Sequence, residues 1–184
     1  MKVEPLDIPD VKIITPQTFA DDRGHFTETY TEKKFSPVIG DVRFVQDNQS
    51  FSKQAFVLRG LHYQAPPYAQ DKLVRVIAGE IYDVAVDVRQ RSPTFGKWVG
   101  ATISAENRKQ IFVPKGFLHG FLTLQPETLV AYKVSAFYDK ASDGAVMWSS
   151  PEFEIDWPLG DNRVLLSEKD AAAMPFAEFE SPFA

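Results

Sequence analysis

The sequence contains no cysteine in its 184 residues, and this absence excludes disulfide bridges, thiolate metal sites and cysteine nucleophiles. No apolar run approaches the length of about 18 residues that a membrane-spanning helix requires. Residues 1–9 have neither a basic start nor an apolar core, so we expect no signal peptide. Together these absences predict a cytoplasmic protein that makes no contact with a membrane.

The sequence also has fewer basic residues than acidic ones. Lysine and arginine number 20 against 25 aspartates and glutamates, which gives a net charge of −5 at pH 7. Because general nucleic-acid binding requires a basic face, we expect no nucleic-acid partner. A small phosphorylated ligand remains compatible with this charge, since it needs only a few well-placed cations.

The chain is rich in short β-like segments separated by glycine, proline and aspartate. Strands are predicted at residues 11–15, 24–30, 42–51, 56–64, 72–78, 80–88, 98–104, 110–114, 119–124 and 129–137. Helical patterns are confined to residues 31–35 and 167–174. Many short strands with closely spaced turns predict one all-β domain over residues 1–184, a sandwich or barrel with a few short helices.

Three local patterns add detail to this prediction. Gly79 and Glu80 separate two predicted strands, which favours a tight hairpin turn there. In the segment 80–88, valines alternate with aspartate and alanine, so the two sets should face opposite sides of a strand. Residues 174–184 carry prolines and phenylalanines, and this tail either docks on a neighbouring element or frays.

Two of the three histidines lie in clusters of glycine and polar residues. His62 belongs to the segment Arg59-Gly60-Leu61-His62-Tyr63-Gln64, and His119 belongs to Pro114-Lys115-Gly116-Phe117-Leu118-His119-Gly120. Their spacings resemble the two motifs of the cupin superfamily of β-barrels. The resemblance implies a cupin-type jelly roll, in which both histidines line the mouth of the barrel.

The first motif departs from the cupin pattern at the positions that bind metal. Gln64 occupies the place of the motif's second histidine, and Lys72 stands where a glutamate is usual. An ammonium at a ligand position repels a divalent cation, so we expect no metal ion and no other cofactor. The same ammonium favours an anionic ligand, or a negative charge that develops during a reaction.

Further segments resemble the dTDP-4-dehydrorhamnose 3,5-epimerase family, in order along nearly the whole chain. They are residues 22–28, 44–48, 57–64, 72–76, 83–87, 92–98, the cluster around His119, and residues 132, 138, 157–158 and 166–170. Each is weakly diagnostic alone, whereas the series is highly specific. The resemblance implies a homodimeric enzyme that converts dTDP-4-dehydro-6-deoxy-D-glucose to dTDP-4-dehydro-L-rhamnose, by inversion at carbons 3 and 5.

The resemblance also assigns catalytic roles that agree with the chemistry of such a reaction. A ketone at carbon 4 acidifies the hydrogens on carbons 3 and 5, and inversion needs a base on one face and an acid on the other. His62 is the implied base, with Asp170 as the carboxylate that orients it. Tyr132 is the implied acid, and Lys72 would stabilise the enolate oxygen.

Substrate-binding residues carry over in the same way. They are Arg23, Phe26, Glu28, Gln46, Asn48, Arg59, His119, Tyr138, Asp143 and Lys169. The two arginines match pyrophosphate clamps, and Tyr138 matches a thymine-stacking aromatic. Asp143 stands where the family usually has glutamate, and some of these contacts could cross a dimer interface. Simple alternation puts Arg59 and His62 on opposite faces of a strand, so we expect a bulge or bend at Gly60.

Other functions remain open at this point. Single-centre epimerases of related deoxysugars share the same histidine and aspartate. A metal-dependent cupin dioxygenase or isomerase is a different class, and Lys72 and Gln64 argue against it. A non-catalytic sugar-nucleotide-binding cupin would need no acid–base pair.

Overall fold

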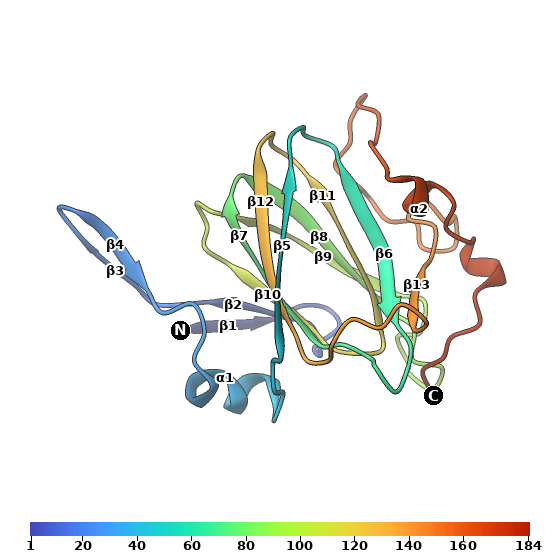
Figure 1. The fold of residues 1–184 in the computed structure, drawn as a ribbon, viewed down its shortest axis with the longest axis horizontal. Coiled ribbons are helices and arrows are strands. Elements are labelled where there is room, and N and C mark those ends of the chain that lie inside the picture. The colour runs from blue at the N-terminus through green and yellow to red at the C-terminus, as the bar shows by residue number, and fades with distance from the viewer.

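The computed structural model describes residues 1–184 and consists mainly of two β-sheets packed face to face (Figure 1). The six-stranded sheet has the order β1-β2-β10-β7-β12-β5, and the five-stranded sheet has the order β13-β6-β11-β8-β9. A separate two-stranded hairpin, β3-β4, completes the strand set. The predicted all-β class with a few short helices is confirmed. No helix is long and apolar enough to cross a bilayer.

Most predicted strands are present with slightly different ends. The six-stranded sheet comprises β1 (Lys2–Pro5), β2 (Lys12–Thr15), β10 (Gln110–Val113), β7 (Lys72–Ala78), β12 (Thr128–Val134) and β5 (Gln46–Ser52). The five-stranded sheet comprises β13 (Asp143–Ala145), β6 (Leu58–Gln64), β11 (Phe117–Thr123), β8 (Glu80–Asp87) and β9 (Trp98–Ser104). The hairpin comprises β3 (Thr18–Asp21) and β4 (Gly24–Thr27). The sequence did not reveal β1, β3 and β13, because each is short and lacks an alternating apolar face.

The prediction of a hairpin at Gly79 is wrong. β7 pairs with β10 and β12, whereas β8 pairs with β9 and β11, so the chain crosses from one sheet to the other at this glycine. Gly79 has φ of +79°, and a side chain here would collide with Thr128. Glycine is therefore required at the crossing for the same conformational reason that it would suit a hairpin.

The alternation of β8 places its two faces in two different hydrophobic clusters. Val84, Val86 and Val88 pack in a cluster with Trp157 and Phe183, on the side covered by the C-terminal part of the chain. The other face of β8 contributes its apolar side chains, including Ala85, to the core between the sheets. Both faces are buried, as expected for a central strand with cover on each side.

Helix α1 (Glu32–Ile39) packs on the outer face of the six-stranded sheet. It buries Phe35 and Ile39 against Ile14, Leu73 and other members of a third cluster. The helix continues past Pro37, beyond the predicted end at residue 35. α2 (Glu168–Ala171) and the 3₁₀ helix η1 (Phe176–Glu178) belong to the C-terminal segment, which lies on the five-stranded sheet (Figure 1).

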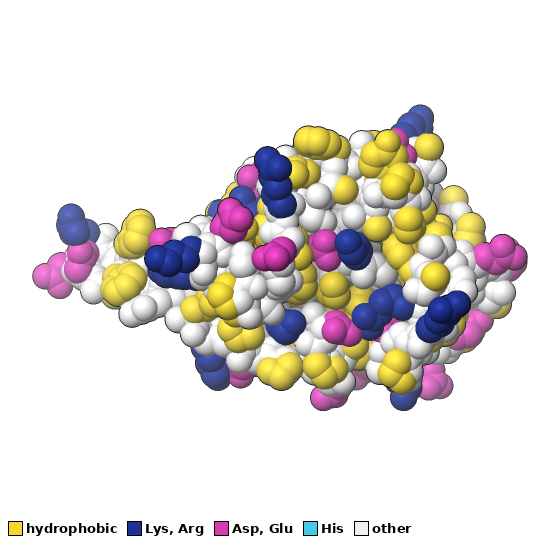
Figure 2. Space-filling view, turned by 90° about the horizontal axis from the view of Figure 1, so that it is seen from below, with side chains coloured by type: hydrophobic (Ala, Val, Ile, Leu, Met, Phe, Trp, Pro, Cys, Tyr) yellow, Lys and Arg dark blue, Asp and Glu magenta, His cyan; other side chains and the backbone are white.

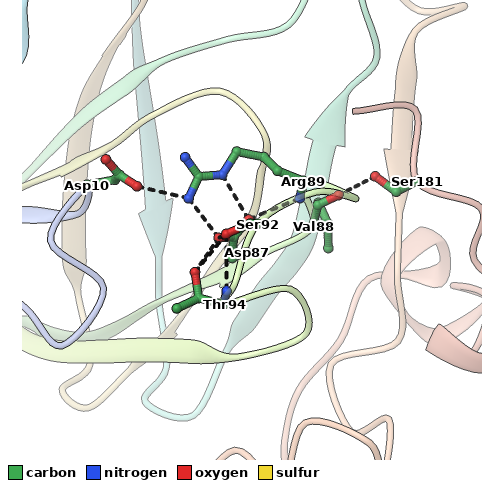
Figure 3. A network of polar contacts seen from close by, with 7 residues as sticks. All are labelled: Asp10, Asp87, Val88, Arg89, Ser92, Thr94 and Ser181. Carbon is green, nitrogen blue, oxygen red and sulfur yellow. Dashed lines mark hydrogen bonds and ion pairs between the residues drawn. The ribbon is translucent and has the colours of Figure 1, made fainter. Parts of the chain in front are cut away.

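The C-terminal tail is held by a loop that a buried aspartate organises. The Asp87 carboxylate accepts hydrogen bonds from Arg89 Nη2 at 2.7 Å and from the hydroxyls of Ser92 and Thr94 at 2.6 Å each (Figure 3). The Ser181 hydroxyl donates to the carbonyl of Val88 in the same loop. Because this loop accepts a hydrogen bond from Ser181, the C-terminal tail is held against the barrel of its own chain.

The β3-β4 hairpin extends away from the body as an arm (Figures 1 and 2). Figure 2 shows a charged tip and apolar side chains along the arm. Phe19 and Phe26 are cross-strand partners, and they are 57% and 68% exposed. The arm therefore presents apolar surface that its own chain leaves uncovered.

Candidate active site

Two adjoining cavities of about 330 and 220 Å³ open between residues of the two sheets. Both are lined by His62, Lys72, Tyr132 and Lys169, which makes them two parts of one site. The smaller part also contains Asp170. The structure therefore brings the four predicted catalytic residues to one shared space, although they are up to 108 residues apart in the sequence.

The reactive side chains come from facing walls of this space. His62 lies on β6 of the five-stranded sheet, opposite His119 on β11. Tyr132 lies on β12 of the six-stranded sheet, opposite Asn48 on β5, and Lys72 begins the neighbouring strand β7. A planar group held between the walls would have the imidazole on one side and the phenol on the other.

His62 and Asp170 form a hydrogen-bonded pair. His62 Nε2 lies 2.5 Å from Asp170 Oδ1, and the aspartate side chain is 5% exposed. Burial raises the pKa of this carboxyl, but hydrogen bonds from His62 and Ser167 outweigh burial and hold the pKa below its ordinary value. An ionised Asp170 accepts a hydrogen bond from Nε2–H, and in that tautomer Nδ1 carries the lone pair that can take a proton.

The predicted irregularity at Gly60 is present. Gly60 has φ of +135°, and the pairing of β6 with β11 shifts register between His119 and Phe121. A Cβ at position 60 would lie 2.5 Å from the Cα of Gly120, so the strands approach too closely for any side chain. The irregularity breaks the alternation of β6, and Arg59 and His62 consequently line the same cavity.

Lys72 is a half-buried cation whose pKa reflects its surroundings. Burial lowers the pKa of Lys72 to about 8, and the negative charges of Asp83 and Asp143 oppose this shift. The side chain keeps its proton at neutral pH and presents an ammonium to both parts of the cavity. A cation fixed in a partly dry cavity stabilises a developing negative charge strongly.

Tyr132 is held in its neutral form. Burial raises the pKa of the phenol, and the guanidinium of Arg59 opposes this shift. Arg59 itself donates from Nη2 to the carbonyl of Phe51 at 3.1 Å, at the wall of the smaller cavity. A neutral phenol is the form that can donate a proton.

A second histidine–aspartate pair lies on β11, the strand next to that of His62, and on β8 beyond it. His119 Nε2 is 2.9 Å from Asp83 Oδ1 and 3.0 Å from Asp83 Oδ2, and both residues are buried. Burial lowers the pKa of His119, against the opposing effect of Asp83. His119 lines the smaller cavity.

The larger cavity collects polar side chains that the sequence assigned to substrate. Gln46 donates to Asn48 at 2.9 Å and accepts from the backbone N–H of Tyr138 at 3.2 Å. Asp143 accepts from Lys169 at 2.5 Å and from the Tyr138 hydroxyl at 3.3 Å. Tyr138 is 58% exposed at the edge of the cavity, where its ring is accessible to an aromatic base.

Gln64, at the position of a cupin metal ligand, is fully engaged elsewhere. Its side-chain nitrogen donates to the carbonyls of Tyr68 and Phe137, and its oxygen accepts from the backbone N–H of Asp139. The structure contains no group of three or more histidine, cysteine, aspartate or glutamate side chains arranged to hold a metal ion. Gln64 instead fixes the loop that carries Tyr138.

Three of the predicted substrate residues lie outside the site. Arg23, Phe26 and Glu28 belong to the hairpin arm or its base, and none of them lines either cavity. Arg23 bonds Asp21 at 2.6 Å, and Glu28 pairs with Lys34 at 2.7 Å. Within one chain, these residues are too far along the arm to complete the site.

Several residues of the cavity walls were not predicted from the sequence. They are Ser50, Tyr63, Gln70, Phe121 and Ser167. Asp83, the partner of His119, was not predicted either, although an aspartate within a strand of buried valines is an unusual feature that indicates a satisfied internal charge.

Comparisons with known proteins agree with this geometry. A family model described as dTDP-4-dehydrorhamnose 3,5-epimerase matches residues 5–178. The dTDP-4-dehydrorhamnose 3,5-epimerase of Shigella flexneri is 49% identical over 179 residues, which cover 97% of this chain and 97% of that protein.

Two solved structures of sugar-nucleotide epimerases are also similar to this chain. The dTDP-6-deoxy-D-glucose-3,5-epimerase of Legionella pneumophila, in complex with dTDP-4-keto-L-rhamnose, superposes with a TM-score of 0.93 at 46% identity, covering 97% of this chain and 94% of that one. A 3′-monoepimerase of Streptomyces bikiniensis, in complex with dTDP-quinovose, has a TM-score of 0.88 at 33% identity, covering 94% and 87%.

Proposed function

The chain belongs to the dTDP-4-dehydrorhamnose 3,5-epimerase family, and we propose that it inverts carbons 3 and 5 of dTDP-4-dehydro-6-deoxy-D-glucose to give dTDP-4-dehydro-L-rhamnose. One observation carries the mechanism: His62 and Tyr132 line the same cavity from opposite sheets. Inversion at carbon requires a base and an acid on opposite faces of the reacting centre.

His62 acts as the base in this proposal. Its Nδ1 removes the hydrogen beside the ketone, and the electrons of the broken C–H bond move into an enolate. The imidazolium that forms is stabilised by Asp170, whose carboxylate lies 2.5 Å from Nε2 and is kept ionised by its hydrogen bonds. Such a base contributes roughly 10²–10⁴ in rate.

Lys72 and Tyr132 complete the reaction. The ammonium of Lys72 stabilises the enolate oxygen while the carbon is planar. The phenol of Tyr132 then donates a proton from the opposite face, and burial favours this neutral phenol before transfer. Before the second carbon reacts, the imidazolium of His62 releases its proton to solvent and the phenolate of Tyr132 takes one up. The same two proton transfers at that carbon then give the double epimerisation.

The remaining residues of the cavity bind the nucleotide in this proposal. Arg59 contacts the pyrophosphate, because a guanidinium fork matches phosphate geometry. Tyr138 stacks on the thymine at the exposed edge of the larger cavity. The pair Asp143–Lys169 and the amides of Gln46 and Asn48 line the larger cavity and contact the bound sugar nucleotide there.

Isotope exchange tests the reaction directly. The protein is incubated with the 4-keto-6-deoxy sugar nucleotide in heavy water, and deuterium is followed at each ring carbon. Incorporation at carbons 3 and 5 supports the double epimerase, whereas incorporation at one carbon makes the chain a single-centre epimerase like its Streptomyces relative. His62→Ala should abolish exchange and retain nucleotide binding. A folded His62→Ala protein with full turnover would refute the proposed base.

We also propose that the protein is a homodimer in which the hairpin arm of one copy completes the site of the other. The exposed Phe19 and Phe26 on the arm need an apolar partner surface. The outer face of the six-stranded sheet offers one, with Phe51 and Ile77 being 49% and 42% exposed. An arm placed on a second copy would bring Arg23 toward a pyrophosphate.

Subunit mixing tests this exchange. Arg23→Ala and His62→Ala proteins are each impaired when alone. In a mixed dimer with exchanged arms, one site combines an intact His62 with an intact Arg23, so activity should recover. If each arm served its own subunit, every site of the mixed dimer would carry one defect, and activity would stay low. The experiment therefore separates the two arrangements without a structure of the dimer.

A further inference from the structure

The Asp170 carboxylate uses both of its oxygens in specific contacts. Oδ1 lies 2.5 Å from His62 Nε2, and Oδ2 accepts a hydrogen bond from the Ser167 hydroxyl at 2.7 Å. The same Ser167 Oγ accepts from the backbone N–H of Asp170 at 3.1 Å, as the N-cap of α2. Ser167 therefore makes two separable contacts with Asp170, one as a donor and one as an acceptor.

The backbone around Asp170 is fixed by contacts that do not involve Ser167. Before α2, Leu165 forms a parallel bridge with Val57, and after it Met174 forms one with Val146. Val146 in turn exchanges hydrogen bonds with Leu61, the neighbour of His62, at 3.2 and 2.9 Å. The two bridges attach both ends of the segment 165–174 to the region that carries the base.

Backbone anchoring does not determine the plane of the carboxylate. The last torsion of an aspartate side chain is broad, so the carboxylate rotates easily unless hydrogen bonds hold it. His62 alone could donate its hydrogen bond to either oxygen over a range of angles. The Ser167 hydroxyl removes this freedom, because its bond to Oδ2 leaves only Oδ1 for the imidazole.

We propose that Ser167 is a positioning residue for epimerisation, which fixes the Asp170 carboxylate so that Oδ1 meets the imidazole of His62. This inference rests on the His62–Asp170 base described under the proposed function. Ser167 lines the smaller cavity but acts through Asp170 rather than on the substrate. Removal of Ser167 should therefore affect the chemical step, because the orientation of the Asp170 carboxylate determines how the His62 imidazole is aligned with the sugar.

Three substitutions separate this role from helix capping. Ser167→Ala removes the donor and the cap, whereas Ser167→Gly removes the donor but keeps a backbone suited to an N-cap. Ser167→Thr keeps both functions of the hydroxyl. We expect kcat to fall about tenfold in the alanine and glycine variants, the loss expected for one charge-assisted hydrogen bond. KM should stay within about twofold of the parent value, because substrate contacts are unchanged. The threonine variant should retain most of kcat.

The outcomes distinguish this inference from the proposed function. Asp170→Asn and the double variant with Ser167→Ala are measured in the same assay. If Ser167 acts through Asp170, its removal should have little further effect once the carboxylate is gone. Loss of activity in His62→Ala and Asp170→Asn, with full kcat in both Ser167→Ala and Ser167→Gly, would overturn the positioning role alone. Full activity in His62→Ala would overturn the proposed function itself. A threonine variant as slow as alanine would also contradict the inference.

Discussion

Strand β8 buries two aspartates four residues apart, Asp83 and Asp87, and their surroundings differ sharply. Both side chains are fully buried. Asp87 accepts hydrogen bonds from Arg89, Ser92 and Thr94, whereas Asp83 has a single partner, the Nε2 atom of His119. Burial raises the pKa of Asp87, but its hydrogen bonds outweigh burial and lower the pKa to about 2.

The partners of the two carboxylates come from different parts of the chain. Asp87 is satisfied within its own loop, by residues no more than seven positions away, and the guanidinium of Arg89 also lies 4.8 Å from the centroid of the Phe117 ring. Asp83 pairs with His119 on the neighbouring strand β11, and its negative charge raises the pKa of Lys72. At Asp87 the hydrogen bonds of its own loop outweigh the cost of burying the charge, whereas Lys72, which lines the cavity, keeps a cost of desolvation and is retained for chemistry.

Asp87→Asn should give the largest effect on stability and almost none on catalysis. The substitution leaves Arg89 without its buried counter-ion, and breaking such a pair costs about 3 kcal/mol of unfolding free energy. For a chain of this size, the midpoint of thermal unfolding should fall by roughly 6–12 °C. Turnover at 25 °C should stay unchanged, because Asp87 lines neither cavity. Calorimetry and the exchange assay measure the two quantities on one preparation.

A loss of activity in Asp87→Asn at a constant melting midpoint would contradict a role of Asp87 in stability alone. Asp10→Asn provides the matched control. Asp10 bonds the same guanidinium at 2.9 Å, but its side chain is 54% exposed. An exposed pair contributes little, so this variant should lose less than about 1 kcal/mol.

Lys72→Met should impair catalysis and increase stability, the reverse of what is expected for Asp87→Asn. Catalysis should fall roughly 10²-fold, the cost of removing a group that stabilises an oxyanion. Unfolding free energy should rise by about 1 kcal/mol, because a partly desolvated ammonium is replaced by an apolar side chain of similar length. Lys97→Met, at an exposed position, should change neither quantity. Equal stability of the Lys72→Met protein and its parent would contradict the view that the cavity charges cost stability.

The pH dependence of the parent enzyme follows from the same residue. Catalysis needs the ammonium form, which is lost as pH rises through the pKa of about 8. The value of kcat/KM should therefore decline above pH 8. The folded pKa lies below the ordinary value of 10.5, so the charge penalty is fully present below pH 8 and fades between pH 8 and 10.5. Over that interval, the parent should gain stability relative to Lys72→Met.

Much of the fold was predictable from local pattern. The alternation in β8 predicted which residues face opposite sides, and Gly60 between Arg59 and His62 predicted the irregularity that the register shift confirms. The sheet crossing at Gly79 was not predictable, because a hairpin and a crossing need the same conformational freedom. Strand partners far apart in the sequence decide between them, and local pattern carries no information about those partners.

The sequence predicted which residues line the site, but not the hydrogen bonds between their side chains. Family resemblance supplied His62, Tyr132, Lys72 and Asp170, and the structure places all four at one cavity. Nothing in the spacing from Ser167 to Asp170 beyond a helix cap indicates that the hydroxyl also bonds the carboxylate. Such a contact depends on side-chain orientation within α2, which sequence pattern does not encode.

Acid should remove the stabilisation that the ionised Asp87 carboxylate provides. Asp87 has a folded pKa of about 2 against an ordinary value of 3.8, so its stabilisation is present above pH 3.8 and is lost as pH falls through 2. That contribution amounts to about 2 kcal/mol. Urea unfolding of the parent and of Asp87→Asn at several pH values should therefore give stability curves that are parallel above pH 5 and converge between pH 4 and 2. The Asp10→Asn curve should follow the parent throughout, since its carboxylate is exposed. Parallel curves for Asp87→Asn down to pH 2 would mean that the buried carboxylate is not held ionised by its loop, and the distinction between the two aspartates of β8 would then lose its physical basis.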